Sequence, residues 1–187
     1  RARVCGFHGA ALSAGARRLN MVFWSRPLGA QEQAFVRTHF GASLDALLPR
    51  LRLYQRRLGD TRRALSMNGG RIFMPRAFFT QSDPRQPLRL SHPQIAGIFA
   101  HELLHQWQRL QGMPVTRQAA WLQFKALCTR GDPYAYERCD DPRRMLQRFV
   151  HAQVEQQGQM WEDHVRACVA GQGDAAGALI AAHVRGA

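Results

Sequence analysis

Apolar residues recur with a helical period over much of the chain. Residues 31–40 predict one helix and residues 44–58 another, although Pro49 interrupts the second, so that two short helices or one kinked helix both satisfy the pattern.

Two other stretches favour strands. Residues 19–24 form a short β-prone run, and within residues 64–79 an Asn-Gly-Gly sequence separates two such runs, which predicts a β-hairpin.

The most informative helix is predicted near the middle of the chain. Ser91 or His92 begins it, Pro93 suits its first turn, and Gly112 and Pro114 end it. Apolar side chains cover most of its circumference between these limits, and a helix that is apolar nearly all round is typical of a protein core. We therefore expect this helix to be buried.

The C-terminal part predicts two further helices. A short one covers 121–128, and after a loop over 131–140 a long one begins at Asp141, a good N-cap, and extends to about residue 170. A Gly- and Ala-rich tail, 171–187, is expected to be irregular. Together with the hairpin, these helices indicate a mainly α protein with a small β-hairpin or sheet, an α+β fold.

The length of 187 residues suits a single domain, residues 1–187, in which 1–20 and 171–187 are expected to be irregular or peripheral. No run of 18 apolar residues occurs, so no transmembrane helix is expected. The chain begins with Arg1, from which we expect a processed or cloned fragment.

The chain is strongly basic, with 26 Lys and Arg against 13 Asp and Glu and a net charge of +13. All of the 26 except Lys125 are arginines. Such a surface attracts nucleic acid, anionic lipid or an acidic substrate, or it is simply a solvated arginine-rich surface. Because the arginines are scattered without interleaved aromatic residues, we expect a solvated surface and no nucleic-acid partner.

The four cysteines contain no Cys-x-x-Cys pair, so we expect neither a cysteine-type zinc site nor a thioredoxin-like motif. Cys128 and Cys139 flank a loop and would be able to form a disulfide in an exported chain. Otherwise the thiols are free and act as small buried hydrophobic groups. Both alternatives stay open.

Residues 101–105 read HELLH and carry the chemistry of the chain. Residues four apart lie on one face of a helix, so His101 and His105 are spaced to bind one zinc ion through two imidazole nitrogens. Glu102 lies about 100° further round the helix. Its carboxylate can there take a proton from a water whose pKa zinc lowers to about 7. The motif predicts a catalytic zinc site with Glu102 as general base.

A catalytic zinc needs a third protein ligand from another element. We predict Glu155, in the middle of the expected long helix, because Gly158 shares its face and would let that helix press closely against the histidine helix. Glu162 and His151 lie on roughly the same face and are the alternatives, with Glu162 the better of the two.

Residues 101–108, HELLHQWQ, resemble the His-Glu-x-x-His-x-x-Gln segment of zincin-like bacterial domains. These include metallopeptidase domains associated with Vgr-related proteins, contractile injection systems and polymorphic toxins. Residues 64–74 are similar to the β segment that precedes the zinc helix in those domains, and residues 154–160 to their downstream Glu-Gln-Gln-Ala segment. The resemblance covers about residues 60–165.

The resemblance implies a gluzincin-type site, in which two helix histidines and Glu155 hold zinc and the two ligand-bearing helices pack together. The chain departs from the Glu-x-x-x-Asp form of that site, because Gln159 stands where the aspartate would be. The group that orients a ligand histidine then comes from elsewhere in the chain, or it is Gln159 itself.

We therefore expect a zinc metallopeptidase acting on a protein or peptide, as a secreted effector or processing domain with a secretion-system or toxin partner. Residues 71–74 are expected to pair with an extended peptide. Tyr134 or Tyr136 would donate to the oxyanion, unless both are ordinary half-buried loop tyrosines. We expect a bacterial, exported protein, or otherwise a cytoplasmic one. The competing hypotheses are an inactive zincin-like binding module and a basic nucleic-acid-binding protein that holds zinc.

Overall fold

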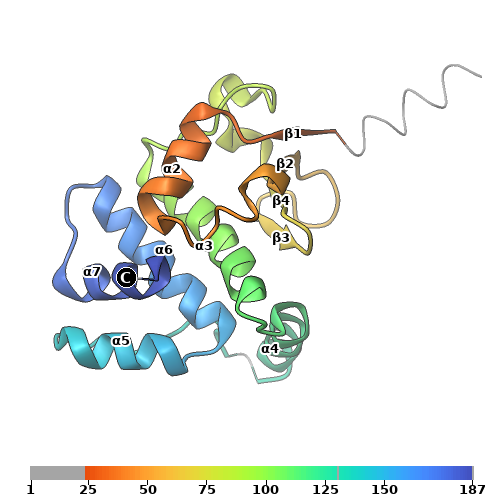
Figure 1. The fold of residues 1–187 in the computed structure, drawn as a ribbon. Helices are drawn as coiled ribbons and strands as arrows, with labels where there is room; N and C mark the ends of the chain where they lie inside the picture. The colour runs from red at the N-terminus through yellow and green to blue at the C-terminus, as the bar shows by residue number, and fades with distance from the viewer. Residues whose placement is uncertain (1–23, 130, 187) are drawn as a thin grey trace, which may run out of the picture.

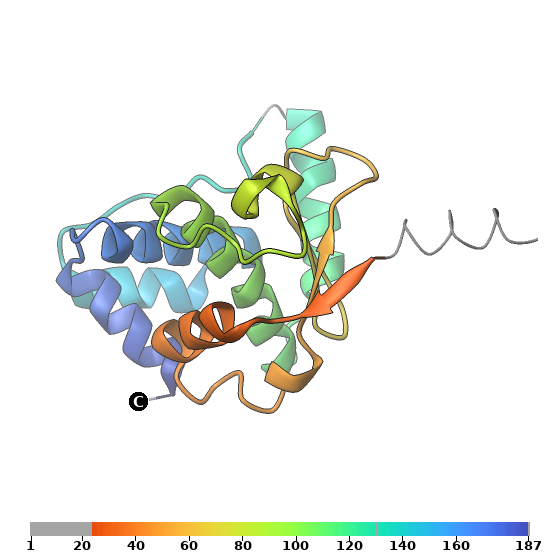
Figure 2. The same cartoon turned by 90° about the horizontal axis from the view of Figure 1, so that it is seen from above.

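The structure, a computed structural model, describes residues 24–129 and 131–186. Helix α3, Pro93–Leu110, runs through the middle, with a small sheet on one side and a group of C-terminal helices on the other (Figure 1). The view from above separates the same two parts (Figure 2). The chain therefore has the mixed, mainly helical α+β architecture that its sequence predicts.

The sheet has four strands in the order β1-β2-β4-β3. They are β1 Ser25–Pro27, β2 Arg52–Gln55, β3 Leu65–Met67 and β4 Arg71–Met74. Strands β2 and β4 run parallel, and the other two pairings are antiparallel. The predicted hairpin is confirmed as β3–β4, where Gly69 and Gly70 form the turn with φ angles of 77° and 78°. The two edges of the sheet are β1 and β3.

Besides α3, the described residues form helices α2 Ala30–Phe40, α4 Val115–Thr129, α5 Pro142–His151, α6 Val154–Val169 and α7 Ala175–Arg185. Short 3-10 turns cover Leu48–Arg50, Arg76–Phe78 and Thr80–Ser82. Helix α3 packs along α6 on one side and against β3 and β4 on the other. This position between two layers explains why the sequence of α3 is apolar nearly all round.

Helix α3 begins and ends as predicted. His92 is its N-cap, Pro93 is its first residue, and Gly112 follows its end with a φ of 76°. Every residue from 99 to 108 is buried. The histidine motif therefore lies in the protein interior.

The helix predicted over residues 44–58 is wrong. The segment instead forms turns and then β2, with Leu51 and Leu53 fully buried. Pro49 cannot continue a helix because it lacks an N–H. Strand β2 pairs with β1 and β4, which are distant in sequence, and such non-local pairing outweighs a local helical period.

The single long helix predicted from Asp141 to about residue 170 is also wrong. Asp141 does cap a helix, but Ala152 and Gln153 adopt extended backbone and divide the segment into α5 and α6. The N–H of Gln153 donates to the side chain of Gln156 and so starts α6 anew. The break lets α5 pack on α7 while α6 packs on α3.

The C-terminal tail is not irregular as predicted, because it contains α7. Asp174 caps this helix by accepting a hydrogen bond from the N–H of Gly177. Its Ile180 and Val184 are buried in the core. The strand predicted over 19–24 lies outside the described residues except for Trp24, which precedes β1.

The disulfide alternative is wrong, since Cys128 and Cys139 are free thiols. The predicted short helix over 121–128 is longer, because it is part of α4. Among the helices that the structure describes, none combines the length and the apolar character needed to cross a bilayer.

Candidate metal centre

Three side chains that can bind a metal converge between α3 and α6. His101 and His105 lie one turn apart on α3, and Glu155 lies in the first turn of α6. Their ligand atoms lie within 4.8 Å of one another, and the side chains are buried. The structure thus brings together the three residues that the sequence selects.

The Nε2 atoms of both histidines face the same carboxylate oxygen. Oε2 of Glu155 lies 3.3 Å from Nε2 of His101 and 3.5 Å from Nε2 of His105. The Nδ1 atoms face other groups. Nδ1 of His101 lies 3.1 Å from Oε2 of Glu162, and Nδ1 of His105 lies 2.8 Å from Oε1 of Gln108.

The orientation of Gln108 is set by its own amide nitrogen. This nitrogen donates to the backbone oxygen of Val154 and to Oε1 of Gln157 at 3.0 and 2.8 Å, so that Oε1 of Gln108 is left as the acceptor for His105. Nδ1 of His105 must therefore carry the proton. The carboxylate of Glu162 has the same effect on His101, because an ionised carboxylate only accepts.

This arrangement fits a cation. When each ring carries its proton on Nδ1 alone, Nε2 presents a lone pair toward an oxygen of Glu155, and two acceptors repel each other unless a proton or a metal ion lies between them. Two imidazole nitrogens and one carboxylate oxygen form a donor set typical of Zn²⁺ and related transition-metal ions. The buried cluster can therefore hold a metal ion.

The charges around the cluster also favour a positive group. Burial lowers the pKa of His101, but hydrogen bonds with Glu155 and Glu162 and the nearby charge of Glu102 outweigh it, so the pKa rises to about 10. Burial raises the pKa of Glu155, and hydrogen bonds with His101 and His105 lower it further than burial raises it. The carboxylates thus stabilise positive charge at the place where the ligand atoms meet.

Gly158 has the packing role that the sequence predicts. A Cβ atom at this position would lie 2.6 Å from Cε1 and Nε2 of His101, closer than real contacts allow. The two helices also approach closely at Gly97 on α3. A Cβ atom added there would lie 2.8 Å from Cγ of Arg166 and 3.0 Å from Cγ of Glu162. One glycine on each helix therefore lets α3 and α6 approach closely enough to share the cluster.

The structure places the two alternative ligands differently. His151 ends α5 and is exposed, so it does not reach the cluster. Glu162 is buried beside His101 and also pairs with Arg166, so it orients a histidine instead of joining the three ligand atoms. Gln159, the other candidate for that orienting role, donates to Asp163.

Gln108, the last residue of the HELLHQWQ segment, has an orienting role that the sequence did not predict. It stands three residues after His105, a spacing that places two side chains on the same face of a helix and allows them to interact. That spacing was the available signal. The spacing alone does not show that Gln108 orients His105, because the hydrogen bonds that fix the Gln108 amide come from Val154 and Gln157 on α6.

Glu102 lies at the wall of a cavity of about 580 Å³ that is also lined by His101, His105 and Glu155. A smaller cavity of about 270 Å³ touches Glu102 and His101 from another side. Burial raises the pKa of Glu102, although the neighbouring imidazoles oppose this. The carboxylate is thus beside the three ligand atoms and in contact with space that a substrate can enter.

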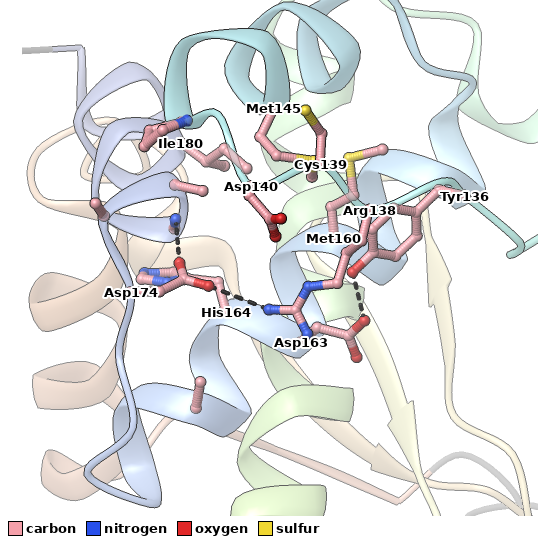
Figure 3. A pocket seen from close by; sticks show the side chains of 15 residues that line it. Tyr136, Arg138, Cys139, Asp140, Met145, Met160, Asp163, His164, Asp174 and Ile180 are labelled. Carbon is pink, nitrogen blue, oxygen red and sulfur yellow. Dashed lines mark hydrogen bonds and ion pairs between the residues drawn. The ribbon is translucent and has the colours of Figure 1, made fainter.

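The two candidate tyrosines are separated. The ring of Tyr134 lies 6.0 Å from the ring of His101 and borders both cavities at the cluster. Tyr136 lines a different cavity, where its hydroxyl donates to Oδ2 of Asp163 at 2.7 Å (Figure 3). The structure therefore brings Tyr134 to the cluster and not Tyr136.

The prediction that residues 71–74 pair with a peptide is wrong. These residues form β4, which lies between β2 and β3 and has no open edge. The open edge that borders the larger cavity is β3, whose three residues all line it.

No protein-family model matches this chain, and comparisons with curated proteins and with solved structures give no match either. The site combines three buried ligand atoms, orienting groups on both histidines and a further carboxylate, Glu102, at the wall of an open cavity.

Proposed function

We propose that the chain is a zinc-dependent peptidase in which His101, His105 and Glu155 hold the metal and Glu102 transfers protons. One observation carries the proposal: a cluster of three ligands lies beside another buried carboxylate, that of Glu102, which borders a cavity. Structural zinc sites are closed by four protein ligands, whereas catalytic sites keep three and leave one position open. This favours an enzyme over an inactive binding module.

The packing of the helices supports a zincin-like interpretation of the fold. Helix α3 carries the histidines, α6 carries the glutamate, and the two are in extensive contact. A small sheet flanks α3 on the opposite side. This is the arrangement that the resemblance in residues 101–108 and 154–160 implies. The secretion-system or toxin partner implied by the same resemblance stays a prediction.

Zinc, when bound, supplies Lewis-acid activation of a carbonyl group and of water. Glu102 would accept a proton from the attacking water and pass it to the departing amine. Glu162 and Gln108 would hold the histidine rings so that both Nε2 atoms stay directed at the site. Tyr134, at the cavity wall beside His101, would donate to the substrate carbonyl.

The substrate would bind as an extended peptide along β3. Edge strands present unpaired backbone groups that a peptide can use as an added strand. Strand β3 is anchored to α3, because Gln106 donates to the carbonyl of Met67 at 2.8 Å and Arg109 donates to that of Ser66 at 3.0 Å. A peptide on this edge would lie in the cavity that Glu102 borders.

The test compares the Glu102→Gln variant with the parent protein. The variant should keep its zinc in elemental analysis and lose hydrolysis of a denatured protein mixture by at least about 100-fold. Glu137→Gln, the same change at an exposed loop position, is the control and should leave both unchanged. Chelator should abolish the activity of the parent. Undiminished turnover in Glu102→Gln, or no metal in protein prepared with excess zinc, would contradict the proposal.

A further inference from the structure

The cavity beside the metal cluster is lined by arginines without carboxylate partners. Four arginines border it: Arg56, Arg63, Arg71 and Arg109. Within the described part of the chain, the ion pairs to carboxylates involve other arginines, and none of these four lies within 4.0 Å of an acidic oxygen. Among the described residues, no carboxylate therefore forms a direct ion pair with any of these four guanidinium groups.

Arg109 is the most constrained of the four. It lies one helical turn after His105 and is half-buried, with its Nη atoms donating to Oγ and to the backbone oxygen of Ser66 at 2.9 and 3.0 Å. Its Nε, like that of Arg56, is buried and has no hydrogen-bond partner among the described residues. An unsatisfied buried donor is unfavourable, and an anionic ligand would relieve that cost.

The arginine content of this cavity is a local feature and does not simply follow from the composition of the chain. The cavity around Tyr136 is lined by three aspartates, Asp140, Asp163 and Asp174, and by one arginine (Figure 3). That arginine, Arg138, is paired with Asp174 at 3.1 Å. Two cavities of one protein thus differ in the sign of their lining charge.

A bound metal does not remove the positive charge. A divalent cation would be balanced by the carboxylates of Glu102 and Glu155. The remaining carboxylate in the lining is that of Asp60, so one negative charge is to be compared with the positive charges of the four arginines. Four positive charges against one negative charge leave an excess of three, and a cavity with such an excess concentrates anionic ligands.

We propose that this cavity selects peptides that carry an aspartate or glutamate side chain close to the scissile bond, and that Arg109 and Arg71 bind its carboxylate. The planar guanidinium matches a carboxylate with two parallel hydrogen bonds. The cleavage part of this statement rests on the proposed peptidase function. The preference in binding is a property of the cavity and can be measured without cleavage.

The experiment uses the zinc-loaded Glu102→Gln protein, so that the probe is not cut. The probes are fluorescein-labelled alanine hexapeptides in which one Glu, or one Gln, is moved through the six positions. At the best position the Glu peptide should bind about tenfold more tightly than its Gln counterpart. The preference should shrink as salt is added.

Three arginine variants in the same background locate the preference. Arg109→Gln should bring the Glu and Gln peptides to equal affinity. Because Arg109 also holds β3 through Ser66, Arg71→Gln is the second variant. The Arg71 side chain is exposed, and within the described residues its hydrogen bond goes to the turn carbonyl of Asn68. Its removal should reduce the preference without disturbing Ser66. Arg37→Gln, on the exposed side of α2, is the charge-matched control and should keep the full preference.

Equal affinity of the Glu and Gln peptides for the Glu102→Gln protein that retains all four arginines would overturn the inference. A preference that survives both Arg109→Gln and Arg71→Gln would also overturn it, because the carboxylate would then be binding the metal alone. Displacement of the peptide by single-stranded DNA with a steep salt dependence would assign the arginines to phosphate instead.

Preferential binding without cleavage by the parent protein would support this inference and refute the peptidase. Equal cleavage of Glu and Gln peptides would refute this inference and leave the peptidase standing.

Discussion

Gly158→Ala tests whether the close approach of α6 to α3 determines metal binding. The added Cβ would lie 2.6 Å from the ring of His101, whereas ordinary contacts begin at 3.4 Å, so the ring or the helix must move by roughly 0.8 Å. Metal–ligand distances tolerate deviations of only about 0.2 Å. A displaced ligand histidine should therefore weaken zinc binding by about 10- to 100-fold.

The same substitution should affect folding much less than metal binding. Alanine favours a helix over glycine by about 1 kcal/mol, and overpacking costs about 1–3 kcal/mol, so the free energy of unfolding of the metal-free protein should fall by no more than about 2 kcal/mol. Competition with a chelating dye gives the zinc affinity, and urea unfolding without metal gives the stability.

Gly173→Ala is the matched control for this experiment. Its Cβ would meet only the sulfur of Cys168 at 3.7 Å, an ordinary contact, so zinc affinity should not change. Parental zinc affinity in a folded Gly158→Ala protein would refute the reasoning, because the interhelical distance would then not determine where His101 lies.

Three further predictions concern groups around the cluster and in the core. Glu162→Gln removes the carboxylate at Nδ1 of His101 and should lower zinc affinity about tenfold in the same competition assay; an unchanged affinity would show that the orientation of this ring does not depend on charge. Gln108→Ala leaves Nδ1 of His105 without its acceptor and should lower the free energy of unfolding in urea by about 1–3 kcal/mol, with equal stability counting against the assigned hydrogen bonds. Burial, with His164 and Arg185 nearby, lowers the pKa of His39 from 6.5 to about 4. The unfolded chain therefore binds more protons between these two pH values, so stability should fall as the pH drops from 6.5 to 4, and His39→Gln should weaken that dependence in thermal unfolding; parallel pH profiles would contradict the shift.

The parts of the fold that depend on local pattern were predictable. Helix α3 follows from a buried apolar period with Pro93 at its start and Gly112 after its end, and the β3–β4 hairpin follows from its Asn-Gly-Gly turn. The errors occur where a local pattern competes with non-local partners. Residues 44–58 repeat with a helical period but pair as a strand, and the run after Asp141 continues with helical residues through the break at Gln153.

The sequence by itself determined the histidine pair and Glu102 of the candidate metal centre, and it favoured Glu155 over Glu162 and His151 as the third ligand. His101, Glu102 and His105 follow from the four-residue spacing on one helix, and Glu155 follows from the nearby Gly158 that permits close packing. These inferences need only the period of a helix and the size of a side chain, which are properties of the chain itself.

Only the tertiary structure decided which neighbours complete the site. It assigned the orienting role to Glu162 and Gln108, brought Tyr134 and not Tyr136 to the cluster, and made β3 the open edge. It also gathered scattered arginines around one cavity. The physical reason is common to all of these: each depends on how elements far apart in sequence come together in space, and no local period contains that information.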